Sequence, residues 1–134
     1  MKQIKILMLF VCFGFIGAAK AQVESTIQYV ATYTWTGATN TQWSNAGNWT
    51  VVHNAPATTV VPGFPNITNV GGLTQIQNAV IPATGITNFP VLTGALTISV
   101  SNLDIATGAS LSLGGRTLVV NGFISGTGEI VGGQ

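Results

Sequence analysis

Residues 96–131 read LTISVSNLDIATGASLSLGGRTLVVNGFISGTGEIV, and this stretch decides the fold class. Apolar side chains alternate with Thr, Ser or Asp over short segments. Such alternation places one apolar face of each strand against a core. The residues that we expect to face inward are Leu96, Ile98, Leu103, Ile105, Leu111, Leu113, Leu118, Val120 and Ile130.

Small-residue turns separate these strands. They are Thr107-Gly-Ala109, Gly114-Gly115, Asn121-Gly122 and Gly126-Thr-Gly128. Glycine tolerates positive φ angles, and Asn or Thr favours tight bends. Taken alone, Asn121-Gly122 favours a β-hairpin.

A weak repeat favours stacked coils over hairpins. Leu103 and Ile105 recur further along the chain as Leu118 and Val120, and Gly114-Gly115 recurs at positions 132–133. This spacing approximates one coil of a parallel β-helix, in which like residues stack and bury an apolar core. A β-sandwich has similarly short strands and stays the alternative.

The preceding region, residues 22–90, is rich in turns. Gln22 to Tyr33 is a polar leader that becomes a strand, with Tyr29, Ala31 and Tyr33 on one face. All five prolines lie after Trp35 and no later than Pro90, so we expect only short strands there. Those short strands are expected near Val51, near Val60 and at Ala79 to Ile81.

The composition excludes several classes of function. The 134 residues are 46% hydrophobic and only 5% charged. Lys2, Lys5 and Lys20 lie close to the N-terminus, so the rest of the chain carries Arg116 alone against three carboxylates. A single arginine cannot neutralise a nucleic-acid backbone, which excludes nucleic acid as a partner. Few ionisable side chains are also available to act as a general acid or base. We therefore expect no enzymatic activity and no cofactor.

Residues 1–21 have the three regions of a secretory signal peptide. Lys2 and Lys5 precede an apolar run from Ile6 to Ala19, and an Ala-Lys-Ala site predicts cleavage between Ala21 and Gln22. The apolar run is shorter than the about 20 residues that span a bilayer. The mature chain, residues 22–134, then has no cysteine and no membrane span. We therefore expect a protein that is secreted or on the cell surface and that has no disulfide or thiolate metal site.

The segment from Trp35 to Trp49 joins three tryptophans to small turn-forming residues. The T-W-T-G sequence at 34–37, the W-x-x-x-x-N-W element at 43–49 and the later Leu103-Asp-Ile105 to Leu113 run resemble the start of large secreted bacterial surface proteins. Those surface proteins resemble adhesins or autotransporter passengers. The resemblance implies that this chain is a right-handed parallel β-helix with a structural or adhesive role. Such proteins usually have many more coils. We therefore expect either a truncated reading frame or the N-terminal piece of a longer product.

The sequence offers few candidate functional residues. Trp35, Trp43 and Trp49 form either a platform that stacks sugar rings or the small core of a cap, and the second interpretation is favoured. His53 is expected to be a solvated loop residue. Asp104 and Glu129 alternate outward, and a glycosidase pair or cation site formed by them is disfavoured because Arg116 and His53 are the only bases available. No metal site is predicted.

The sequence thus predicts three parts and a non-catalytic role. Residues 1–21 are the signal peptide, residues 22–90 a strand- and turn-rich N-terminal cap, and residues 91–134 the β-helix coils. The expected function is that of a secreted or cell-surface structural or adhesive β-solenoid module, with surface glycans or like chains as partners. The alternatives are a carbohydrate-binding module that uses the tryptophan segment and the N-terminal fragment of a larger carbohydrate-active β-helix enzyme.

Overall fold

The computed structural model describes residues 28–67 and 74–132 and is all-β. The described strands are β1 (Gln28–Trp35), β2 (Trp49–His53), β3 (Thr74–Ile81), β4 (Thr97–Val100), β5 (Asn102–Ile105), β6 (Ser110–Ser112), β7 (Thr117–Val120), β8 (Ile124–Gly126) and β9 (Glu129–Val131). One short 3-10 helix, η1 (Ala46–Asn48), precedes β2. The predicted all-β class is confirmed. The predicted signal peptide and its cleavage site at Ala21 and Gln22 lie outside the described residues.

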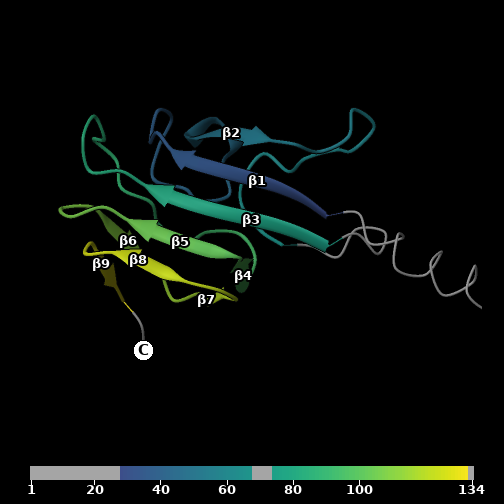
Figure 1. The fold of residues 1–134 in the computed structure, drawn as a ribbon. Helices are drawn as coiled ribbons and strands as arrows, with labels where there is room; N and C mark the ends of the chain where they lie inside the picture. Colours follow the sequence, from purple (N-terminus) through teal and green to yellow (C-terminus); the bar gives the residue numbers. More distant parts are fainter. Residues whose placement is uncertain (1–27, 68–73, 133–134) are drawn as a thin grey trace, which may run out of the picture.

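The strand pairing is mostly parallel (Figure 1). A five-stranded sheet has the order β2-β1-β3-β5-β8, in which only the β1–β2 pair is antiparallel. Two further sheets each contain one parallel pair, β4–β7 and β6–β9. Two parallel strands cannot be joined by a tight turn, so the partners in each parallel pair are far apart along the chain.

The intervals along the chain between partners are nearly constant in the later strands. Thr97 pairs with Thr117, Ser110 with Glu129 and Leu103 with Ile124. Each interval is about 20 positions, which lies at the short end of the periods that repeat proteins use. The expected repeat of Leu103 as Leu118 is therefore wrong, because Leu118 pairs with Ile98 instead. From β3 onward, consecutive strands lie in different sheets, so Asn121-Gly122 is a corner between β7 and β8 and not a hairpin turn.

All three sheets contribute side chains to one core. Tyr29, Ala31 and Tyr33 of β1 are buried, as the alternation predicted, and they lie beside the buried side chains of β3. The remaining buried apolar side chains are Trp35, Trp43, Trp49, Ala79, Ile81, Leu92, Ile98, Val100, Leu103, Ile105, Ala109 and Leu111. The strand β3 is eight residues long, so the expectation of only short strands before Pro90 is wrong. The prolines flank this strand and do not interrupt it, whereas Val60 lies in no strand and is exposed.

The residues predicted to face inward are buried or partly buried in the middle of the later region, and the prediction is wrong at its two ends. Ile98, Leu103, Ile105 and Leu111 are buried, and Leu113, Leu118 and Val120 are partly buried. Leu96 is 73% exposed because β4 begins just after it, at Thr97. Ile130 of β9 is 41% exposed, although its partner Leu111 in β6 is fully buried.

Candidate functional site

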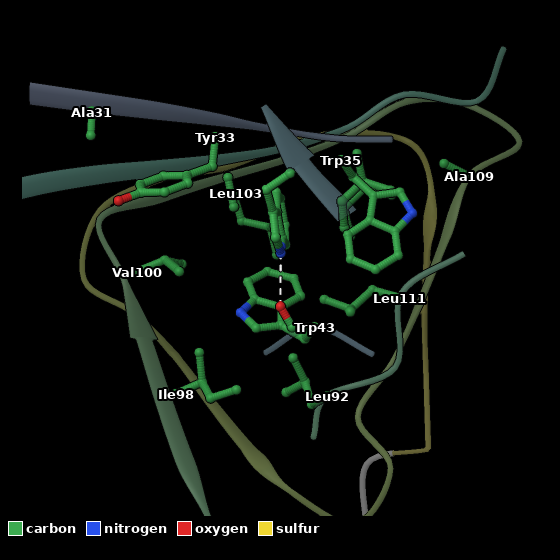
Figure 2. Close-up of a cluster of buried hydrophobic side chains, with 14 of the residues drawn as sticks. Ala31, Tyr33, Trp35, Trp43, Leu92, Ile98, Val100, Leu103, Ala109 and Leu111 are labelled. Carbon is green, nitrogen blue, oxygen red and sulfur yellow. Dashed lines mark hydrogen bonds between the residues drawn. The ribbon is translucent and has the colours of Figure 1, made fainter. Parts of the chain in front are cut away.

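The three tryptophans belong to one buried cluster, and Figure 2 shows Trp35 and Trp43 among its other side chains. Trp35 ends β1 and pairs in register with Trp49, which begins β2. Trp43 comes from the connection between these strands. The Trp49 ring meets the ring of Trp35 at a centroid distance of 5.0 Å and that of Trp43 at 4.7 Å, both edge to face. Tyr33 adds a fourth ring, at 6.3 Å from Trp49. Edge-to-face geometry is the arrangement that aromatic rings favour in a packed core.

Each indole N–H in this cluster has a backbone acceptor. Trp35 donates to the Asn88 carbonyl at 2.7 Å, Trp43 to the Pro65 carbonyl at 3.0 Å, and Trp49 to the Trp43 carbonyl at 2.7 Å. The three side chains are between 0% and 7% exposed. A sugar ring needs an accessible aromatic face, which these buried side chains do not present. This placement fits the interpretation of Trp35, Trp43 and Trp49 as a packed cap and does not fit a sugar-stacking platform.

Asn48 holds the loop that carries Trp43. Its side chain is completely buried. Its Oδ1 accepts hydrogen bonds from the backbone N–H groups of Thr39 and Asn40, and its Nδ2 donates to Asn40 Oδ1 and to the Gln42 carbonyl. All four hydrogen-bonding positions of the amide are thus used. The sequence analysis did not select Asn48 as a core residue, because an isolated asparagine in a turn-rich segment gives no such signal.

A second buried amide joins the 61–67 segment to the sheets. Gln77 is fully buried, accepts from the Asn66 N–H at 2.8 Å and donates to Gln75 at 2.9 Å. Asn66 in turn accepts from the Ser99 N–H at 3.1 Å. These contacts connect β3 to β4 through the loop. Sequence reasoning missed them, since Gln77 follows the alternation of β3 without being apolar.

The ionisable candidates lie apart. Asp104 is on the outer side of β5 and accepts a hydrogen bond from Ser125 Oγ at 2.8 Å. Glu129 begins β9, which belongs to a different sheet, and His53 ends β2 with its Nδ1 accepting from the Ala55 N–H at 3.3 Å. Within residues 28–67 and 74–132, no three His, Cys, Asp or Glu side chains are grouped as metal ligands would be.

The face formed by the last three strands contrasts with the tryptophan end. We call β7, β8, β9 and Phe123 the end layer. Several of its large apolar side chains are exposed, with Phe123 at 79%, Ile124 at 60% and Ile130 at 41%, whereas Leu118 and Val120 are partly buried. Phe123 lies in the corner between β7 and β8, and Ile124 begins β8. Among the described residues, the indoles beside β1 and β2 are thus buried, whereas Phe123, Ile124 and Ile130 are exposed.

Comparison of the chain with protein-family profiles, with curated proteins and with solved structures gave no match. In the described part of the chain, no helix has the length and apolar character needed to cross a membrane.

Proposed function

We propose that this chain is a parallel β-solenoid module with a tryptophan-rich N-terminal cap, and that its role is structural or adhesive, outside the cell or at its surface, without catalysis. The parallel pairs β4–β7, β5–β8 and β6–β9, whose partners are separated by nearly the same length of chain, carry this proposal. A chain that returns to the same side at a near-constant interval, and whose three sheets share a core, has the properties of a solenoid coil.

The structure around the three tryptophans supports the assignment of the cap. A solenoid needs a closed first layer, because its strands otherwise leave an apolar end and free backbone groups. The antiparallel strand β2 covers one side of β1, and the buried Trp43 side chain packs against Trp49. Asn48 fixes the connecting loop. These features act as a lid on the first layer.

The outer surface supports a mechanical role. The residues of β1, β3 and β5 that alternate with the buried ones are Thr, Asn, Val, Ile and one Asp, and Asn102 Nδ2 donates to Asn78 Oδ1 at 2.8 Å between neighbouring strands. Hydrogen bonds between equivalent positions of adjacent layers stiffen a stack of strands. A weakly charged, rigid stack is suited to hold or space other parts at a surface.

Two measurements in the source cells test this role. Immunodetection after cell fractionation should find the protein in the medium or at the surface, with residues 1–21 removed. Deletion of the gene should reduce attachment of cells to one another or to a substratum, and the wild-type gene should restore it. Cytoplasmic protein with an intact N-terminus, or unchanged attachment in the deletion strain, would contradict the proposal.

No observation in the described residues favours the glycan-binding alternative. The three indoles that would stack on sugars are buried and hydrogen-bonded to the backbone. We therefore propose no glycan site.

A further inference from the structure

Three segments form the first coil of the proposed solenoid. The strand β1 pairs with β3. Residues 41–43 exchange two backbone hydrogen bonds with Val91, at 2.7 and 2.9 Å, and Val91 bridges in turn to Ser112 of β6. Ile67 donates its N–H to the Ser99 carbonyl of β4 at 2.7 Å. The first coil thus follows the same three sides as the coils that stack on it.

One corner of this first coil carries an insertion. The corners that lead into β4 and β7 are residues 93–96 and 113–116. The equivalent corner of the first coil starts in register with them, since Ser44 Oγ lies 3.0 Å from Thr93 Oγ1. It then continues through residues 45–65, which we call the insertion and which contain η1 and β2. The antiparallel strand therefore comes from a single enlarged corner.

The insertion folds back along the outer edge of β1, on the side away from β3 (Figure 1). Within the insertion, β2 pairs with residues 31–35. Beyond the two ends of this pairing, the Thr36 N–H donates to the Asn48 carbonyl at 2.8 Å, and Val30 and Asn54 exchange two hydrogen bonds, at 2.7 and 3.2 Å. One of these two uses the Asn54 side chain in place of a backbone carbonyl. The insertion thus extends the ladder past both ends of β2.

The edge that the insertion covers has no other protection. Edge strands are usually protected by charged side chains, by proline or by bulges. Residues 28–67 contain no Lys, Arg, Asp or Glu, and β1 contains no proline or glycine. The strand β2 replaces this eight-residue edge by a shorter one of five residues. Because backbone groups alternate in direction along a strand, only Val51 and His53 direct both of theirs outward, since the Trp49 N–H donates to the Ala46 carbonyl.

A second copy of β1 is the partner that fits this edge when β2 is released. The pairing with β2 shows that the edge accepts an antiparallel strand. A two-fold axis between two copies of β1 supplies such a strand, and two-fold contacts are the commonest in homo-oligomers. Like charges facing each other would oppose the pairing of identical strands, and β1 has no charged side chain.

We infer that the insertion is an edge guard, an autoinhibitory contact that keeps β1 from pairing with β1 of a second copy of this chain. The inference rests on the proposed solenoid, because only there do residues 45–65 interrupt a repeating coil. It adds to the proposed structural role a control over where like chains join. Association through the tryptophan end then requires β2 to leave β1.

Sedimentation equilibrium of the purified chain, as the cell processes it, tests the guard. Val52 lies opposite Thr32 and directs its N–H towards β1. Val52→Pro should raise the self-association constant at least about tenfold over the wild type, because proline removes this N–H and disrupts the ladder. The matched control is Val51→Pro, whose N–H points away from β1, and it should leave the constant at the wild-type value.

A second substitution locates the new contact. Thr34→Lys, added to Val52→Pro, places like charges close together where two copies of β1 pair and should return association to the wild-type value. Thr97→Lys, added to Val52→Pro, changes an exposed threonine at the start of β4 and should leave association raised. Hydrogen exchange of the Thr32 amide shows directly whether β2 has left β1.

Three outcomes would overturn the inference. They are unchanged association of Val52→Pro although the Thr32 amide has lost its protection, an equal rise for Val51→Pro, and equal suppression by the two lysines. If Val52→Pro does not melt cooperatively, Asn54→Ala replaces it, because it frees the Val30 N–H alone. We then expect a smaller rise in association, and no rise would overturn the guard. Failure of the guard leaves the localisation and attachment tests of the proposed function unaffected, so the two failures are distinguishable.

Discussion

Asn48 is the polar residue on which the cap depends most. Asn48→Ala removes a buried amide that satisfies two backbone N–H groups and one backbone carbonyl. We expect a loss of about 3 kcal/mol in the free energy of unfolding, because buried groups left without a partner cost about 1–3 kcal/mol each. Urea unfolding followed by tryptophan fluorescence measures this loss.

Asn54 gives the control for that substitution. Its Oδ1 also accepts a backbone hydrogen bond, from Val30 at 2.7 Å, but the residue is exposed, so water can replace the side chain. Asn54→Ala should reduce the stability by less than about 1 kcal/mol. Equal losses at the two positions would show that Asn48 does not hold the cap.

Trp43 tests the packing of the indoles. Its side chain is fully buried, so Trp43→Ala should lower the free energy of unfolding by about 3–5 kcal/mol. Val60→Ala, at an exposed position, should change it by less than about 0.5 kcal/mol. A small loss for Trp43→Ala would mean that the ring is accessible, and would return the tryptophan segment to consideration as a ligand platform.

Tyr33 gives the fold a dependence on alkaline pH. Burial, and secondarily the neighbouring Tyr29, raises the pKa of Tyr33 from 10.0 to about 12, and its hydroxyl donates to the Pro62 carbonyl at 2.9 Å. The unfolded chain releases this proton near pH 10 while the folded chain still holds it. Stability should therefore be constant below about pH 10 with respect to this group and fall as the pH rises towards 12.

Urea midpoints between pH 9 and 12 measure this fall. Tyr33→Phe removes the titrating hydroxyl, so the variant should lose less stability across the same interval than the wild type. Parallel curves for the two proteins would show that another group causes the alkaline dependence.

At the scale of elements, the corner glycines fix where one strand ends and the next begins. Gly126 ends β8 with φ +83°, and a Cβ there would overlap the Ile105 carbonyl of the neighbouring strand. Gly85 has φ +75° but open space around its Cβ position. Gly85→Ala should therefore cost about 1 kcal/mol for backbone strain alone, and Gly126→Ala clearly more. Chemical unfolding of both variants tests this, and equal losses would show that the β5–β8 contact is loose.

Alternation along the chain was sufficient to place most of the later strands. The segments around Ile98, Leu103 and Leu111 became β4, β5 and β6 with the predicted residues buried, because a period of two directly reports a half-buried strand. The predicted burial of Leu96 and Ile130 was wrong for different reasons. Leu96 comes just before the first residue of β4, and alternation does not locate the start of a strand. Ile130 lies in a strand, but alternation reports which face a residue is on and not what packs against that face.

Pairing between strands was harder to predict than the strands themselves. The β1–β3 pair joins Tyr29 to Gln75, far apart in the sequence, and no local pattern indicates this. The true interval between stacked strands was also missed, because Leu, Ile and Val recur at several spacings in a chain so rich in them. For the candidate site, the tryptophans were found by their spacing, whereas Asn48 and Gln77 became visible only through their hydrogen bonds.

At the scale of the whole molecule, the two ends of the described structure differ. The tryptophan end is closed by buried aromatic rings and a buried amide, and the end layer presents exposed apolar side chains. In the solenoid that we propose, stability is approximately a sum of layer terms and contacts between neighbouring layers. An added layer of the correct length should therefore join the stack, which would not hold for a β-sandwich.

The most direct test of the central claim is the unfolding of a variant in which residues 105–125 are repeated in tandem. The length of this insertion equals the interval along the chain between the paired Leu103 and Ile124. A stacked-layer architecture predicts one cooperative transition with a higher urea midpoint and a steeper dependence on urea than the wild type, since one more layer is buried. A scrambled insertion of the same composition serves as the control and should lower the midpoint. A tandem repeat that also lowers the midpoint, or that unfolds separately from the rest, would contradict the stacked-layer architecture.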